Sequence, residues 1–323
     1  MASNDLKITK KSYQKFDGFK SSKLVLEFEG KLVSPSFVNS IRRATIDYVP
    51  IYGFAPQSIN IEKNTSLFNN DYMRLRISQI IIPNINVPVV FLPDKYWKNI
   101  NISDPNREKH PDDTKKLEMY VNAENKTDTV MNVTTKHAQF FEDGKEITPF
   151  SDKYPHLIIQ LRPKEVFACR AVGVLNVGRN NNIWAAAGNA YHEYEFENPN
   201  KILLTIESQG QIDEFEILRR TCIILKEKVG YVKEYIQKNY NNKTIETGAI
   251  KLELENEDYT LGNLINESFQ NNPDIKYSGC AVPDYAADRV VIKLNDEKKS
   301  IMSSLDSVID ILNDVEKQIK KLV

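Results

Sequence analysis

Cysteine is scarce in this 323-residue sequence, which contains only Cys169, Cys222 and Cys280. An odd number of widely spaced cysteines argues against a disulfide framework and is typical of small buried side chains in a reducing compartment. No cysteine precedes residue 169, and the four histidines are too scattered to suggest a shared metal ion. We therefore expect neither a metal nor a cofactor.

Long apolar runs are also missing. No run reaches the roughly 18 apolar residues that mark a membrane-spanning helix, and the opening residues, MASNDLKITKK, lack the apolar core of a signal peptide. Hydrophobic residues make up 41% of the chain and charged residues 27%, which is typical of folded globular proteins. The sequence predicts a folded, soluble, cytoplasmic protein without a targeting signal.

An excess of positive charge is absent as well. The formal net charge is −1, and the sequence divides it unevenly. Residues 248–323 hold 9 Lys and Arg against 14 Asp and Glu, a balance of −5, whereas the rest holds 34 against 30, a balance of +4. Neither part is basic enough to bind nucleic acid through its phosphates. Primary nucleic-acid binding is therefore not expected.

Recognisable catalytic motifs are also absent. The sequence has no Walker loop, nucleophile elbow or HExxH motif. The stretch 173–191 is rich in Gly and Asn, but no Lys-Ser or Lys-Thr follows Gly173 and Gly178 at the spacing of a nucleotide-binding fingerprint. An independent enzyme or ligand-binding α+β protein that uses this stretch as a pocket remains the alternative function.

Helical periodicity is what the sequence has in abundance. Apolar residues recur at steps of three and four over residues 215–236, and again over 301–322. Each stripe is 22 residues long, or about 33 Å as a helix. Additional apolar residues widen both stripes, which indicates helices covered on more than one side. We interpret this as packing on a sheet and on the other half of the chain, with two unrelated surface helices as the alternative.

Shorter elements are predicted around these helices. Ser34 and Pro35 favour the start of a helix that ends near Tyr48, and Asp213 can cap the stripe at 215–236. A further helix begins near residue 259, where apolar residues again follow helical spacing. The polar stretch 237–249 predicts a linker. Strands are predicted at 24–33, 57–63, twice within 156–171, and at 202–207, 250–256 and 289–294.

The wording of two stretches resembles the alpha-like subunits of multisubunit RNA polymerases. Residues 258–264, DYTLGNL, followed by Val282-Pro283, resemble the D-H-T-L-G-N and V-P pattern of the small alpha-like subunit. Residues 37–43, FVNSIRR, followed by Val49-Pro50, resemble the F-x-N-x-x-R-R and V-P pattern of the large one. Residues 118–135 resemble the family's strand–turn–strand, which implies two strands there. The sequence departs from the family at Tyr259, where His is usual, and at 284–287.

Because both patterns lie on one chain, the sequence resembles the single-chain fusion of two alpha-like subunits found in some large DNA viruses. The separate forms are the archaeal D and L subunits, the bacterial alpha subunit and the eukaryotic third and eleventh subunits. The resemblance implies an α+β fold in which two alpha-like dimerisation half-domains, each a sheet with long helices, pack in cis. It implies a large half at 1–83 and 201–238, an inserted mixed α/β or mainly β module at 84–200, a linker at 239–249 and a small half at 250–323.

The function implied by the resemblance is a non-catalytic assembly platform of a DNA-dependent RNA polymerase. Its partners are then the two large catalytic subunits and small polymerase subunits, and its location is the cytoplasm, a viral factory or the virion. Arg42 and Arg43 are adjacent and therefore point about 100° apart on a helix, so both cannot face the core; a solvated polar face is the alternative to a subunit contact. The implied contacts with other subunits are Asn39, Arg42, Arg43, Arg76 and Trp184. The implied interface between the halves consists of Phe37, Ile41, Leu218, Cys222, Leu225, Leu261, Leu264, Leu305, Val308 and Leu312.

Overall fold

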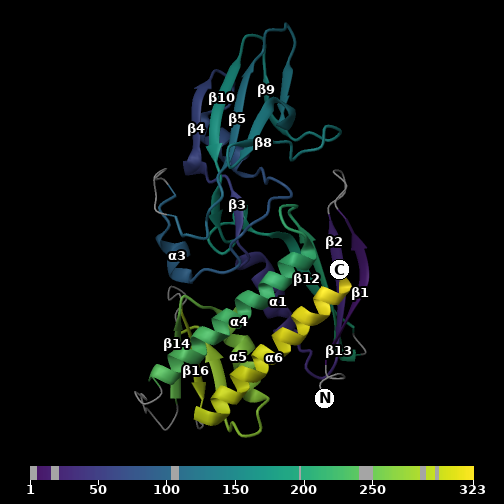
Figure 1. The fold of residues 1–323 in the computed structure, drawn as a ribbon, viewed down its shortest axis with the longest axis vertical. Coiled ribbons are helices and arrows are strands. Elements are labelled where there is room, and N and C mark those ends of the chain that lie inside the picture. Colours follow the sequence, from purple (N-terminus) through teal and green to yellow (C-terminus); the bar gives the residue numbers. More distant parts are fainter. Residues whose placement is uncertain are drawn as a thin grey trace.

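The computed structural model describes residues 6–15, 22–102, 109–195, 198–239, 250–283, 289–294 and 298–323. It has a mixed α+β architecture, as predicted, with the long helices α4 (Glu214–Asn239) and α6 (Lys298–Leu322) at one end of the molecule and a five-stranded sheet at the other (Figure 1). The buried apolar side chains form one continuous core that includes residues from both ends of the sequence. None of the described helices is long and apolar enough to cross a membrane.

Helix α1 (Pro35–Asp47) begins and ends as predicted. The Ser34 side chain accepts a hydrogen bond of 3.0 Å from the Phe37 backbone N–H, which satisfies one of the free donors of the first turn. The long helix α4 also starts at its predicted cap, where Asp213 Oδ1 accepts a 3.0 Å bond from the Glu216 N–H. Both helix starts were therefore encoded locally.

A four-stranded antiparallel sheet supports these helices. Its strand order is β1 (Lys7–Gln14), β2 (Lys23–Glu29), β13 (Asn198–Ser208) and β12 (Ala187–Glu195). Helix α1 packs on β12 and β13, and α4 also packs on β13. The predicted strand at 24–33 is shorter than expected, because Gly30 takes a φ of 139° and breaks the extended run.

The five-stranded sheet has the order β4 (Ile59–Asn64), β10 (Val166–Val172), β5 (Leu117–Glu124), β7 (Ala138–Glu142) and β8 (Lys145–Ile147). Two small sheets accompany it, β6 (Met131–Thr134) with β9 (Leu157–Leu161), and β3 (Ile51–Gly53) with β11 (Val174–Asn176). The two strands predicted within 118–135 are thus β5 and β6, and those within 156–171 are β9 and β10. Helices α2 (Asn70–Ser78) and α3 (Asp94–Asn99) were not predicted.

The strand pairing does not follow the predicted bounds of the inserted module at 84–200. Strand β4 precedes residue 84 yet pairs with β10 in the five-stranded sheet. Strand β12 lies before residue 200 yet belongs to the four-stranded sheet. Both partners are distant in sequence, so the hydrophobic pattern of a single strand carries no information about them.

The C-terminal part contains a three-stranded antiparallel sheet of order β14 (Ile250–Glu255), β16 (Arg289–Leu294) and β15 (Ser278–Ala281); α5 (Tyr259–Gln270) packs on this sheet, and α6 packs on α5. Strands β14 and β16 match the prediction, whereas the short β15 was missed. Gly262 lets α5 approach the sheet, because a Cβ there would lie 2.7 Å from Val290 Cγ2. The linker predicted at 239–249, apart from Asn239, and the departure at 284–287 lie outside the described residues.

Candidate subunit-interface site

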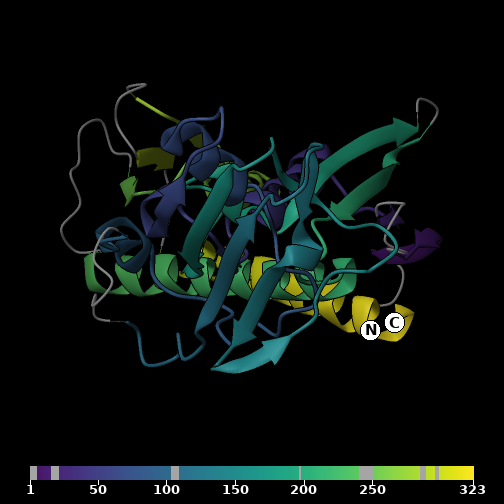
Figure 2. The same cartoon turned by 90° about the horizontal axis from the view of Figure 1, so that it is seen from above.

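The two long helices lie side by side and pack together along their lengths (Figures 1 and 2). Lys226 donates to Glu316 Oε2 at 2.6 Å, and Lys233 pairs with Asp306 further along. Because later residues of α4 contact earlier residues of α6, the helices run antiparallel. The contact joins the C-terminal 74-residue part, 250–323, to the part that precedes it.

The apolar residues predicted for this interface are all buried. They occupy the four helices α1, α4, α5 and α6, which pack against one another in the pairs α4–α6, α1–α5, α5–α6, α1–α4 and α4–α5. Their burial on mutually packed helices is what an interface between the two parts requires, while their assignment to an interface between two half-domains stays a prediction. The ten residues are Phe37, Ile41, Leu218, Cys222, Leu225, Leu261, Leu264, Leu305, Val308 and Leu312.

Polar contacts tie α1 to the start of α5. Ser40 Oγ donates to the Thr260 carbonyl at 2.8 Å, and Arg43 forms a 2.9 Å ion pair with Asp258. Asp258 also caps α5 by accepting from the Thr260 N–H at 2.7 Å. Burial raises the pKa of Asp258, but the hydrogen bonds from Thr260 and the charge of Arg43 outweigh it and hold the pKa below its ordinary value. This carboxylate is therefore charged at neutral pH and joins the two parts.

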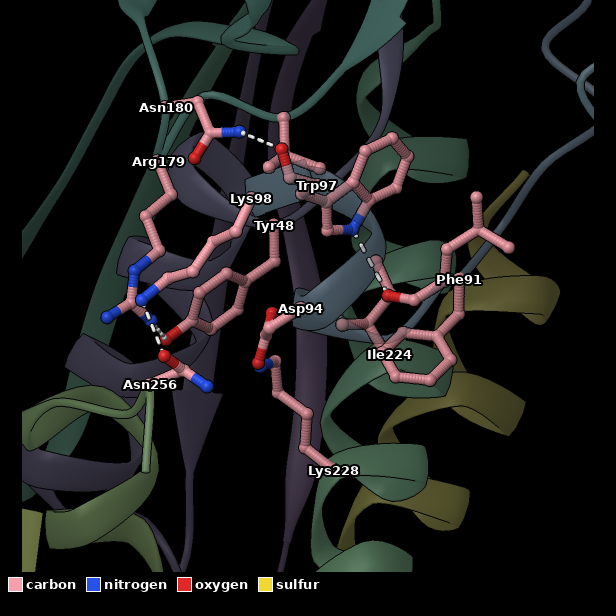
Figure 3. Close-up of a pocket in the computed structure, with 12 residues that line it drawn as sticks. Tyr48, Phe91, Asp94, Trp97, Lys98, Arg179, Asn180, Ile224, Lys228 and Asn256 are labelled. Atoms are coloured by element: carbon pink, nitrogen blue, oxygen red, sulfur yellow. Dashed lines mark hydrogen bonds and ion pairs between the residues drawn. The ribbon is translucent and has the colours of Figure 1, made fainter. Parts of the chain in front are cut away.

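A buried ammonium group marks the place where three segments meet. The Lys228 side chain on α4 is only 3% exposed and lies 2.7 Å from both Asp94 Oδ2 on α3 and Glu257 Oε1 after β14. Its Nζ also lies 4.5 Å from the centre of the Tyr48 ring, within range of a cation–π interaction. Figure 3 shows Lys228 and Asp94 pointing toward one another beside Tyr48. We call Lys228, Asp94 and Glu257 the lysine cluster.

The lysine cluster carries two carboxyl groups and one cation, so one negative charge is in excess when both carboxyl groups are ionised. Burial raises the pKa of Glu257 to about 7, although the Lys228 charge opposes the rise. Asp94 adds to the rise through its own negative charge. Glu257 Oε2 is buried and has no hydrogen-bond partner. The cluster thus retains an unsatisfied acceptor at the junction of the segments.

The cavity beside Lys228 is small. It measures about 20 Å³, which is room for about one water molecule (Figure 3). Asn180 bridges its rim by donating to the Trp97 carbonyl at 3.2 Å, and Trp97 Nε1 donates to the Leu92 carbonyl at 3.1 Å. A cavity of this size cannot hold a nucleotide or a substrate of similar size.

The predicted subunit contacts divide into inward and outward groups. Arg43 faces Asp258, as described, so its charge is used within the chain. Arg42 is half-buried on the same helix, where its Nε donates to Asn39 at 2.9 Å and its Nη1 to the Ala190 carbonyl at 3.3 Å. Asn39 and Arg42 therefore lie together at the partly exposed edge between α1 and β12.

Arg76 and Trp184 both serve the internal packing of the chain. Arg76 on α2 donates to the carbonyls of Ile158, at 2.7 Å, and Leu157, at 3.2 Å, on β9. Trp184 is 3% exposed and its Nε1 donates to the Val174 carbonyl at 2.9 Å. Almost no indole surface is left for a partner, so the structure does not favour Trp184 as a subunit contact.

An exposed apolar surface near Arg76 was missed by the sequence reasoning. Leu67, Phe68, Tyr72 and Leu75 are 70%, 37%, 44% and 58% exposed, and the Phe68 and Tyr72 rings stack 5.0 Å apart. The sequence signal for this surface was the helical spacing of Tyr72 and Leu75, which places both on a different side of the helix from the buried Met73. Contiguous exposed apolar side chains of this kind are typical of interaction sites. We call the four residues the α2 patch.

The glycine-rich stretch 173–191 packs against α1. A Cβ on Gly178 would lie 2.0 Å from the Ile46 carbonyl oxygen, so only glycine fits there. The close backbone approach accounts for this glycine without a bound phosphate. Among the residues that the structure describes, no group of three or more His, Cys, Asp or Glu side chains could hold a metal ion.

Comparison with known proteins gives two matches. Residues 249–322 match the family model described as the RNA polymerase Rpb3/Rpb11 dimerisation domain. Over 93% of its length, the chain is also 29% identical to an Acanthamoeba polyphaga mimivirus protein named as a DNA directed RNA polymerase subunit, of which 90% is covered. These findings support an alpha-like RNA polymerase subunit. The matched residues include β14, α5 and α6, and of these α5 packs on α1 and α4, and α6 packs on α4.

Proposed function

We propose that this chain is a non-catalytic assembly platform of a multisubunit DNA-dependent RNA polymerase, in which two alpha-like halves on one chain pair with each other. The observation that carries the proposal is the antiparallel packing of α4 on α6. Helix α6 belongs to the segment matched by a dimerisation domain, and α4 belongs to the preceding part. The surface that a dimerisation domain would use for a partner is thus covered by the same chain.

The mimivirus relative supports a fusion of both halves. Similarity spans 93% of this chain and 90% of the relative, so the two proteins share the N-terminal and C-terminal parts in one polypeptide. Joining two halves by a short linker makes their pairing intramolecular, with an effective concentration on the order of millimolar. We therefore infer that the chain is a monomer whose halves saturate each other.

The partners in this proposal are the two large catalytic subunits and small polymerase subunits. Two outward regions suit such contacts. The first is the edge formed by Asn39 and Arg42, since an arginine at an interface can bind a carboxylate with two hydrogen bonds. The second is the α2 patch, whose apolar side chains would be covered on assembly. The chemistry of transcription would belong to the large subunits, and the proposed location is the cytoplasm, a viral factory or the virion.

The proposal is tested by co-expressing the tagged chain with the two large polymerase subunits from the same source. The expected result is a stable complex of all three proteins, identified by mass spectrometry after affinity purification. Arg42→Ala and Leu75→Asp should each weaken recovery of a large subunit without changing the circular dichroism spectrum. Ser307→Asp, at an exposed position on α6 outside both regions, is the control.

Two outcomes would contradict the proposal. One is recovery of the tagged chain alone under conditions in which the large subunits are folded. The other is a stable homodimer at micromolar concentration by light scattering, because a self-complementary surface is incompatible with halves that saturate each other. An Arg42→Ala and Arg43→Ala double variant is less informative, since Arg43 also holds Asp258 within the chain.

A further inference from the structure

The short helix α3 depends on its contacts with the rest of the chain. It has six residues, and no side chain among the described residues caps its N-terminus. A helix of this length is not stable on its own in water. Asp94 pairs with Lys228, and the Trp97 carbonyl accepts a hydrogen bond from Asn180. The Trp97 side chain is buried and lines the same small cavity as Asp94 and Lys228 (Figure 3).

The two carboxyl groups of the lysine cluster differ in how firmly their backbones are held. Glu257 lies between β14, which pairs with β16, and Asp258, which caps α5 and pairs with Arg43. Its Oε2 is buried and accepts no hydrogen bond from the described residues. Asp94 lies on α3, and its side chain is 26% exposed. When both groups are ionised, Asp94 is therefore the one that can leave Lys228 for water.

Protonation of Glu257 decides whether the charges of the cluster balance. With Glu257 neutral, Lys228 and Asp94 form a one-to-one ion pair. With Glu257 ionised, the cluster has one negative charge in excess, and a buried carboxylate with an unsatisfied oxygen is costly. Burial, with the charge of Asp94, raises the pKa of Glu257 to about 7, so the change falls near neutral pH. Departure of Asp94 then relieves the repulsion and admits water to Glu257.

Other charged and titratable groups surround Glu257. Arg179, which follows β11, favours its ionised form, as Lys228 does. The pKa of Asp258 lies below its ordinary value, as described, and burial raises the pKa of Tyr48. Neither of these two groups therefore titrates near neutral pH. The full set is Lys228, Tyr231 and Tyr235 of α4, Asp94, Lys95 and Lys98 of α3, Glu253 and Glu255 of β14, Arg179, Tyr48 and Asp258.

We propose that the lysine cluster is a proton-operated latch for α3. Uptake of one proton by Glu257 leaves Asp94 as the ionised carboxylate paired with Lys228 and secures α3, whereas loss of that proton releases Asp94 and, with it, α3. The proton exchanges with solvent water. The latch is a property of the chain itself, so it goes beyond the proposed polymerase function and does not depend on it.

The test measures acrylamide quenching of Trp97 fluorescence in the full-length chain between pH 6 and 8. Trp97 and Trp184 are the two tryptophans of the sequence, so subtraction of the signal of Trp97→Phe isolates the α3 indole. We expect the quenching constant of Trp97 to rise about twofold from pH 6 to 8, because release of α3 exposes a buried side chain. Hydrogen exchange of residues 94–99, corrected for the intrinsic rate at each pH, should accelerate over the same range.

Two variants assign the effect to the lysine cluster. Glu257→Gln cannot ionise and should keep α3 secured at both pH values. Asp94→Asn leaves Lys228 and Glu257 as a balanced pair, so Glu257 stays ionised over the whole range. Quenching and exchange should therefore become independent of pH in each variant, apart from a constant offset in Asp94→Asn.

Histidine titration is the competing explanation. The His110 ring lies 5.6 Å from the ring of Tyr96 on α3, centre to centre. His110→Gln is therefore the control, and it should retain the full pH dependence. Equal quenching and exchange at both pH values in the wild type, a pH dependence that persists in Glu257→Gln, or its loss in His110→Gln would each overturn the proposal. The assay contains no polymerase subunit, so its failure leaves the proposed platform function standing.

Discussion

Replacement of Lys228 by methionine removes the cation of the lysine cluster while keeping most of its apolar stem. The Lys228 and Glu257 side chains are 3% and 9% exposed, so the remaining Glu257 carboxylate cannot regain full hydration. The Asp94 side chain is 26% exposed, so it is already partly hydrated and regains more of its hydration. Breaking a buried ion pair by removing one partner costs about 3–5 kcal/mol of unfolding free energy. We expect Lys228→Met to lower the free energy of unfolding by an amount in that range at pH 8.

A double-mutant cycle separates the ion pair from lost packing. Glu257→Gln alone should cost no more than about 1 kcal/mol at pH 8, since its amide oxygen still accepts from Lys228 and Asp94 still pairs with it. In the Glu257→Gln background, loss of the lysine leaves no buried charge at position 257, so the two changes should couple by about 2 kcal/mol. The cycle is measured by urea unfolding, followed by circular dichroism.

Lys233→Met is the matched control on the same helix. Its partner Asp306 is 57% exposed, so water replaces the lost pair and the cost should stay below about 1 kcal/mol. Two results would refute the reasoning. One is a Lys228→Met cost equal to that of the control, and the other is additivity of the Lys228 and Glu257 changes, which would mean that the buried charges do not depend on each other.

Three further predictions follow from single sites. Because the pKa of Glu257 is raised to about 7, the contribution of its protonated carboxyl group to stability is fully present below about pH 4.5 and is lost as pH rises through 7. The stability of Glu257→Gln relative to wild type, measured by urea unfolding, should therefore increase between pH 5 and 8. Leu312→Asp places a charge in a fully buried contact and should cost several kcal/mol and cause aggregation on size-exclusion chromatography, whereas Ser307→Asp on the exposed side of α6 should not. Gly178→Ala should lower the free energy of unfolding by about 2 kcal/mol or more in thermal melts, because its Cβ would overlap the Ile46 carbonyl.

Local signals in the sequence were sufficient for most individual elements. The Ser34 and Asp213 caps fixed where α1 and α4 begin, and the apolar steps of three and four described α4 and α6 over nearly their full lengths. These features depend on residues within a few positions of one another. The approach missed β15, whose four residues are too short for an alternating pattern to stand out, and it also missed the longer strands β1 and β12.

The division into sheets depended on contacts that single elements do not encode. Residue Asn60 on β4 pairs with Arg170 on β10, and nothing in residues 59–64 specifies that partner. The inserted module was therefore placed from composition and resemblance, and strand pairing crosses its predicted bounds, because β4 outside them pairs with β10 and β12 inside them pairs with β13. The alternating pattern of a strand with one buried face shows which side is apolar, but it does not identify the strand that pairs with it.

The same limit explains the arginine pair and the lysine cluster. Helical geometry required Arg42 and Arg43 to diverge, but only the fold brings Asp258 to Arg43, so the sequence could not say which arginine remains available. Lys228 follows Glu227 in a helix rich in charged residues, so the sequence alone suggests a solvated lysine. In the fold, Glu257 and the α3 segment bury it. No periodic pattern in the sequence predicts buried charges of this kind, because their partners come from other segments. They lie where the segments meet, and we expect the stability of the chain to be most sensitive to mutation at those places.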